Sequence, residues 1–189
     1  MSKEPNDALR RALGAAVVLM LIGGLPFFLR MFGGQQFLPS TTWVAQSFWL
    51  AIACAAFCAI LPSVVGVRGR IRDGGDRKSI KYLLLLAFVP ALGGTLGYNA
   101  VAGGGAMLYT WGVGKPTELP YVVKRAKRSV DRKCRNPIAL RGMPILSHEL
   151  CGFPEEFIAN LSPGQTLLVS GNGSPLGVFV STARVAGTP

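Results

Sequence analysis

Two cysteines in the charged C-terminal part of the chain, Cys134 and Cys151, are candidates for a disulfide bond. Disulfides persist in oxidising compartments, and the loop that this bond would close has 18 residues. In the chain-entropy model, closing such a loop stabilises a small fold by about 3 kcal/mol. The sequence therefore predicts the bond if this region lies outside the cytoplasm, and the alternative is two free thiols.

Cys54 and Cys58 lie four residues apart in an uncharged stretch and would share one face of a helix. Such a pair could supply two thiolates to a metal or haem site, but no apolar stretch holds a His, Asp or Glu to complete it. Cysteine is also an ordinary small buried residue. We therefore interpret both residues as structural and predict no metal site and no cofactor.

The single histidine, His148, stands beside Glu149 and is the one residue that suggests acid–base chemistry. Zinc binding would need further ligands, and proton transfer would need a positioned partner. Asp131, Glu155 and Glu156 are available, but no motif such as HExxH ties them to the histidine. An enzyme that uses His148 with nearby carboxylates is therefore kept as an alternative, and no catalytic residue is predicted.

A basic run between positions 124 and 135 has the composition of an anion-binding surface. It contains one acid, Asp131, and seven basic residues: Lys124, Arg125, Lys127, Arg128, Arg132, Lys133 and Arg135. Lipid headgroups and the acidic face of a partner are candidate ligands, and a solvated surface is the alternative. The run lacks interleaved aromatic residues, so nucleic acid is not predicted as a partner, and no small-molecule substrate is identified.

Small residues four apart occur twice in one apolar stretch, as Gly93 with Gly97 and Ala100 with Gly104. In a lipid environment this spacing lets two helix backbones approach closely. The contact can lie within the chain or between subunits, and the sequence leaves both open. Asn99 is the one strongly polar side chain in the same span and is expected to face protein rather than lipid.

Charge is distributed in a way that indicates a bilayer. Residues 31–67 and 82–114 contain no Asp, Glu, Lys or Arg, although 15% of the chain is charged. A charge at the bilayer centre costs at least about 2.5 kcal/mol, whereas a soluble core does not segregate charge over such lengths. We predict a membrane protein with about three transmembrane α-helices, at about 12–29, 43–67 and 82–103, within a transmembrane region that spans 12–114.

Lysine and arginine counts predict the orientation. The N-terminal segment 1–11 has three, the first loop has one (Arg30) and the loop 68–81 has six. The N-terminus and the loop 68–81 are therefore expected in the cytoplasm, and the chain beyond residue 114 outside. Trp43, Tyr109 and Trp111 would then share the outer interface. A cleaved signal peptide is the alternative for the first apolar stretch, but that stretch is longer than usual and lacks a cleavage signature.

The segment 115–189 is predicted to form a small, mostly-β extracytoplasmic domain. The part 120–130 fits a strand or a helix, and "PEEFIANL" fits a short helix with Pro154 at its first position. Asn172 and Gly173 separate two β-prone runs, which predicts a hairpin with a type I′ turn at these two residues.

These features together predict a non-enzymatic structural or interaction protein of a bacterial inner membrane. Its external β domain would contact a partner in an envelope assembly. The expected partners are membrane lipids and other membrane or periplasmic proteins. The first alternative is an accessory subunit of a membrane enzyme or transporter complex, and the second is the enzyme that uses His148.

Overall fold

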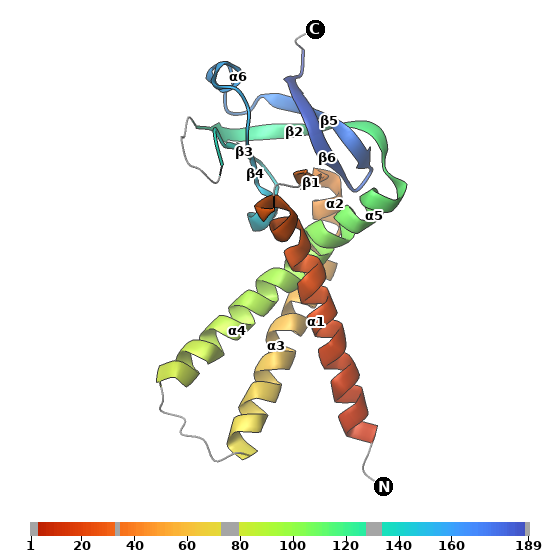
Figure 1. The fold of residues 1–189 in the computed structure, drawn as a ribbon, viewed down its shortest axis with the longest axis vertical. Helices are drawn as coiled ribbons and strands as arrows, with labels where there is room; N and C mark the ends of the chain where they lie inside the picture. Colours follow the sequence, from red (N-terminus) through yellow and green to blue (C-terminus); the bar gives the residue numbers. More distant parts are fainter. Residues whose placement is uncertain (1–3, 33–34, 73–79, 128–133, 188–189) are drawn as a thin grey trace. The chain divides into compact units, whose positions relative to one another are not determined.

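The computed structural model divides the chain into two compact units (Figure 1). The helical unit comprises Met1–Leu25 and Phe48–Gly104. The β unit comprises Pro26–Ser47 and Gly105–Pro189. The residues that the structure describes are 4–32, 35–72, 80–127 and 134–187. The β unit thus draws on a segment near residue 40 as well as on the C-terminal part of the chain.

Two helices are long and apolar enough to cross a membrane, by length and composition. They lie at Asp7–Leu29, within α1 (Glu4–Met31), and at Phe48–Arg68, within α3 (Phe48–Arg72). Both indicate a membrane protein. The structure starts α3 at Phe48, later than position 43, because Thr41–Gln46 forms a separate helix, α2.

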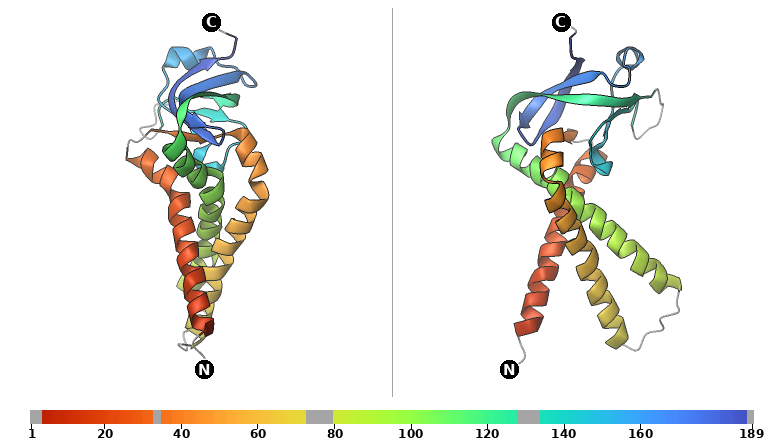
Figure 2. Two further views of the ribbon diagram at one scale, coloured as in Figure 1. Left: turned by 90° about the vertical axis from the view of Figure 1, so that its right-hand side faces the viewer. Right: turned by 180° about the vertical axis from the view of Figure 1, so that it is seen from behind.

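Further helices follow α3 in the described part of the chain (Figures 1 and 2). Helix α4 spans Ile80–Asn99 and continues as a π-helical segment, Ala100–Gly105, and then as α5, Ala106–Val113. α1, α3 and α4 each contain one proline inside the helix. The prolines are Pro26, Pro62 and Pro90.

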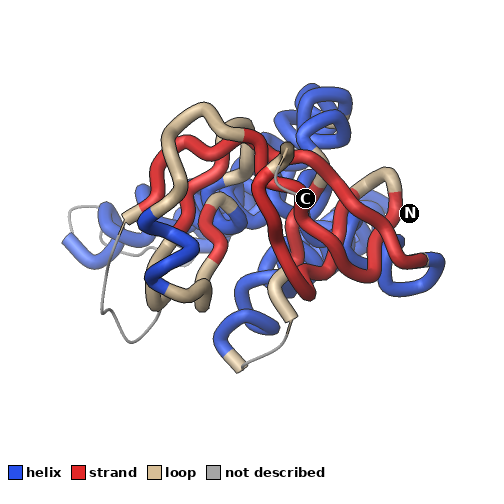
Figure 3. The backbone as a smooth tube through the Cα atoms, turned by 90° about the horizontal axis from the view of Figure 1, so that it is seen from above, coloured by secondary structure: helices blue, strands red, loops and turns tan. Residues whose placement is uncertain are grey.

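The described part of the β unit contains a six-stranded antiparallel sheet with the strand order β1-β6-β5-β2-β3-β4. Figure 3 shows its strands in red. Its strands are β1 (Phe37–Pro39), β2 (Lys115–Ala126), β3 (Ile138–Leu140), β4 (Glu149–Leu150), β5 (Thr166–Ser174) and β6 (Gly177–Val185). The sheet confirms a β domain after the helices. It also shows that the chain is a strand up to and including Ala126, so the helical alternative for 120–130 is wrong for 120–126. Residues 128–130 lie outside the described residues.

Strand β1 is remote in sequence from the strand that it pairs with. Its residues align with β6, with Leu38 opposite Val178. The Leu38 side chain is completely buried, and its carbonyl oxygen accepts a hydrogen bond from the Tyr121 hydroxyl at 3.3 Å. Burial also raises the pKa of Tyr121, so the phenol stays neutral and keeps donating. The segment before α3 is therefore part of the β fold.

The side chain of Gln36 joins the two edge strands of the curled sheet. Its amide nitrogen donates to the carbonyl oxygen of Glu149, and its amide oxygen accepts from the backbone N–H of Cys151 at 3.2 Å. A side-chain amide has the same donor and acceptor as a peptide group. Gln36 thus replaces a strand neighbour for β4 and protects an exposed edge.

The core of the β unit comes from alternate residues of the strands. In β2, Tyr121 and Val123 point inward, as period-two alternation requires. The fully or nearly buried core residues are Leu38, Tyr121, Val123, Ile138, Leu140, Leu150, Ile158, Leu161, Leu167, Val169 and Val178. Leu38 belongs to this cluster although it precedes the rest by more than eighty positions.

The β5–β6 hairpin turns later than the sequence predicts. Asn172 and Gly173 lie inside β5, paired with β6, and neither has the positive φ of a type I′ turn. The chain reverses at Pro175 and Leu176, after Ser174. The predicted turn is therefore wrong. Proline fixes φ near −65°, which suits the second position of a common β-turn and excludes it from a central strand.

Ser40 fixes the start of α2 to this turn. Its hydroxyl oxygen accepts a hydrogen bond from the N–H of Trp43 at 3.1 Å. The same hydroxyl group donates to the carbonyl oxygen of Pro175 at 2.8 Å. The short helix α6, Glu155–Ala159, begins one residue after the predicted start. Pro154 has extended backbone angles and caps it rather than occupying the first helical position.

Candidate functional site

A basic groove is the candidate site in the β unit. It is an open concavity of about 810 Å³. The lining includes three basic residues, one acid, a histidine and a methionine: Lys124, Arg125, Arg141, Glu149, His148 and Met143. Three of these side chains are permanent cations and one is a carboxylate, so the formal charge of the lining is +2 with His148 neutral (three minus one).

A β-bulge explains why two consecutive basic residues reach the groove. Val123 pairs with Leu140, but the next pair is Arg125 with Ala139, so Lys124 is the extra residue on β2. Regular alternation would turn Arg125 to the buried side that Val123 occupies. The bulge re-aims it, and Lys124 and Arg125 are both exposed.

Arg141 joins these cations through the turn that follows β3. Its backbone N–H donates to the carbonyl of Val122 at 2.9 Å, which places it beside the middle of β2. Gly142 follows with φ +72, a left-handed conformation that glycine adopts without strain. The sequence gives no signal for Arg141, because it lies outside the basic run and enters the groove only through strand pairing.

His148 and Glu149 form the opposite part of the lining. The imidazole Nε2 lies 3.5 Å from Glu149 Oε1. The carbonyl of His148 accepts from the N–H of Leu140 at 2.9 Å, so β3 positions the histidine. Among the described residues, Glu149 is the one acid that lines the groove, whereas the enzyme alternative needs two acids near His148. Asp131 lies outside the described residues. Among the described residues, no three His, Cys, Asp or Glu side chains form a metal cluster.

Only part of the predicted basic run belongs to this groove. Lys127 and Arg135 are exposed but do not line it. Arg128, Arg132 and Lys133 lie outside the described residues. The structure therefore divides the run into two groove residues, Lys124 and Arg125, and two described residues elsewhere on the surface.

The predicted disulfide is present. Cys134 is bonded to Cys151, and their Cα atoms are 5.1 Å apart. The bond joins Cys134, within the basic run, to the residue that follows β4. Close by, Gly152 N–H donates to the carbonyl of Arg135 at 2.8 Å. The bridge thus holds β4, and with it Glu149, against the segment that follows β2.

The four small residues of the predicted packing motif lie at contacts within the helical unit. A Cβ added at Gly97 would be 2.6 Å from the carbonyl oxygen of Cys54, and one at Gly93 would overlap the carbonyl of Cys58. Ala100 is buried, and its backbone nitrogen would be 3.0 Å from a Cβ added at Gly23 of α1. A Cβ added at Gly104 would overlap the backbone carbonyl of Ile22. The thiols of Cys54 and Cys58 are not in a disulfide, and the Cys58 Sγ lies 3.9 Å from the carbonyl oxygen of Ala16 in α1.

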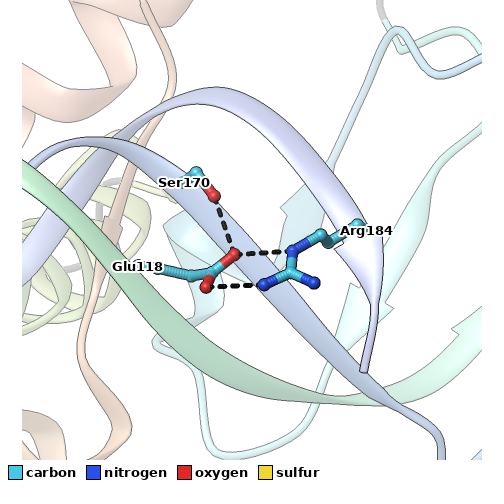
Figure 4. A network of polar contacts seen from close by, with 3 residues as sticks. All are labelled: Glu118, Ser170 and Arg184. Carbon is cyan, nitrogen blue, oxygen red and sulfur yellow. Dashed lines mark hydrogen bonds and ion pairs between the residues drawn. The ribbon is translucent and has the colours of Figure 1, made fainter. Parts of the chain in front are cut away.

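A separate polar network crosses the exposed face of the sheet (Figure 4). Arg184 donates from Nε and one terminal nitrogen to the two carboxylate oxygens of Glu118, each at 3.0 Å. The Ser170 hydroxyl also donates to Glu118, at 3.0 Å. Hydrogen bonds from Arg184 and Ser170 lower the pKa of the Glu118 carboxyl. Sequence reasoning missed this network because only the strand register brings the residues together.

Glu118→Gln is expected to lower the Tm of the β unit slightly at pH 7. A carboxyl with a lowered pKa stabilises the fold above its unfolded pKa, about 4.3 for glutamate, and this is lost as pH falls through the folded pKa. The Tm difference from the parent should therefore shrink below about pH 4. Thermal scans at several pH values measure it, with Lys115→Gln as the control. A difference that stays constant with pH would contradict this role.

Comparison with protein-family models, curated protein sequences and solved structures finds no match to this chain.

Proposed function

We propose that the chain is a membrane-anchored interaction protein of a bacterial inner membrane. In this proposal three helices cross the bilayer, the N-terminus is cytoplasmic and the β unit contacts a partner in an envelope assembly. The observation that carries the interaction role is the basic groove, because exposed cations placed together by a bulge and by strand pairing give a defined surface for an acidic partner.

The connectivity of the β unit supports the number of crossings. Strand β1 precedes α3 and strand β2 follows α5, yet both belong to one sheet. A folded sheet lies on one side of the bilayer, so the chain between β1 and β2 must cross it an even number of times. α3 is long enough for one crossing. Helix α4, with 20 residues and a length of about 30 Å, is the segment available for the return.

Three further observations support an external β unit. Disulfides such as Cys134–Cys151 persist in oxidising compartments. The three, one, six pattern of basic residues favours a cytoplasmic N-terminus and a cytoplasmic 68–81 loop. Trp43, Tyr109 and Trp111, the aromatic residues expected at the outer interface, all belong to the β unit.

Reporter fusions test this topology. Alkaline phosphatase fused after Pro189 is expected to be active because it requires export, and the same reporter inserted at Gly75 is expected to be inactive. A cytoplasmic reporter such as a fluorescent protein at the same two sites provides the control and should give the reverse pattern. An inactive phosphatase at Pro189 combined with an active one at Gly75 would refute the orientation.

An accessory role in a membrane enzyme or transporter complex is the rival within the same topology. Purification in a mild detergent separates the two, because an accessory subunit should remain bound to a cofactor-bearing or transporting subunit. The interaction role instead requires a partner whose contact depends on the groove cations Lys124, Arg125 and Arg141.

A further inference from the structure

The three groove cations come from two neighbouring, paired strands of the sheet, β2 and β3. Lys124 and Arg125 lie at the bulge of β2. Arg141 directly follows β3, and its backbone N–H donates to the carbonyl oxygen of Val122. An ordinary charged surface needs no such arrangement. Here the bulge leaves Lys124 without a strand partner in the β2–β3 pairing. It turns the Arg125 side chain to the face of the sheet that carries Lys124 and Arg141.

The lining favours an oxyanion with more than one negative charge. Guanidinium groups bind phosphate through two parallel hydrogen bonds, and an ammonium adds a point charge. The Glu149 carboxylate offsets one cation, and its Oε1 lies 3.5 Å from the His148 imidazole Nε2. The two arginines and Lys124 leave a net positive lining even when this pair is counted.

The size of the groove indicates that the anion is part of a larger molecule. At about 810 Å³ the concavity exceeds what a single phosphate group fills, and Met143 adds a half-buried apolar surface to the lining. Methionine adapts to irregular apolar ligands because it is unbranched and polarisable. A ligand with a phosphate group for the cations and an adjoining organic part for Met143 matches this lining.

We propose that the basic groove binds the phosphate group of a phosphoester, with Lys124, Arg125 and Arg141 as its cationic contacts. This inference rests on the proposed interaction role of the β unit and names the chemistry that the unit recognises. An anionic phospholipid headgroup and a soluble phosphoester share that chemistry.

Isothermal titration of the full chain in an uncharged detergent tests the groove directly. The probes are dihexanoyl phosphatidate below its micelle concentration and glycerol 3-phosphate, with dihexanoyl phosphatidylcholine as the zwitterionic reference. We expect the phosphatidate to bind and the phosphatidylcholine not to bind. If both phosphate probes bind, the phosphate headgroup is sufficient for recognition. If only the phosphatidate binds, the acyl chains are also required and the ligand is a lipid.

Two double variants with equal loss of charge separate a site from general basicity. Arg125→Gln with Arg141→Gln removes two groove cations and is expected to weaken binding at least tenfold. Lys127→Gln with Arg135→Gln removes two exposed cations of the same region that do not line the groove, and should change binding less than threefold. Raising the salt from 0.1 to 1 M should weaken binding by the parent, since screening shortens the Debye length from about 10 to 3 Å.

Equal weakening by the two double variants, or no binding of either phosphate probe by the parent, would overturn the proposal. The single variant Lys124→Gln gives a second measurement, with an expected loss of at least threefold. Thiol counting before reduction checks folding, because a correctly bridged variant exposes two thiols on denaturation, those of Cys54 and Cys58. In detergent solution the ligand reaches both polar faces of the protein. The binding result is therefore independent of the topology that the reporter fusions test.

Discussion

Leu38→Ala is expected to destabilise the β unit by about 2–5 kcal/mol, the usual cost of a large-to-small change in a core. The side chain is fully buried among residues from the C-terminal strands, and no shift of the short strand β1 can fill the gap without breaking its pairs with β6. The Tm of the unit should fall by roughly 10 °C or more. Thermal scans of the full chain in detergent, followed by tryptophan fluorescence, measure the change.

Leu29→Ala provides a matched control, because the same atoms are removed from an exposed side chain of the same unit. Its Tm should stay within about 2 °C of the parent, as for surface substitutions in general. If Leu38→Ala leaves the Tm as high as this control does, then the segment before α3 is not part of the folded sheet. The even number of crossings inferred from that sheet would lose its support.

Loss of the disulfide is the second large effect. Cys134→Ser or Cys151→Ser should cost about 3 kcal/mol, a large part of the stability of a small domain. The bridge also fixes the end of β4, where the Cys151 N–H bonds to Gln36. Less folded protein should accumulate in either single variant. The double variant should be no worse than either one, because each single change already removes the whole bond.

Thiol labelling of unreduced, denatured protein gives the direct measurement. Cys54 and Cys58 should react at once, and Cys134 and Cys151 only after reduction. Four reactive thiols in protein taken from its native membrane would refute the bond. That result would also weaken the assignment of the β unit to an oxidising compartment.

Much of the architecture follows from local sequence patterns. Long uncharged stretches mark the apolar helices, because desolvating a charge is costly over the whole thickness of a bilayer. The bond between Cys134 and Cys151 follows from their being the two cysteines of the tail. The β character of the tail follows from its β-branched runs, although the hairpin turn was misplaced. There, Asn172-Gly173 has the favoured turn composition, but pairing with β6 extends the strand to Ser174.

The details of the site depended on contacts between distant parts of the chain. Gln36 and Leu38 have no local feature that assigns them to a sheet formed by residues after 114. Arg141 stands outside the basic run, and Arg125 reaches the groove only because a bulge shifts the register of β2. Glu118 and Arg184 are 66 positions apart. Each of these pairings depends on register, and a shift of one residue would turn the side chains to the opposite face.

The sequence by itself therefore determined what each segment prefers: bilayer or water, strand or helix, and an oxidised pair of cysteines. These preferences depend on the free energy of transferring each residue and on neighbours a few positions away. Only the tertiary structure decided which strands are neighbours, that β1 completes the sheet, and that Lys124, Arg125 and Arg141 share one groove. Those outcomes depend on packing and hydrogen bonding among residues far apart in the chain, which a local pattern does not contain.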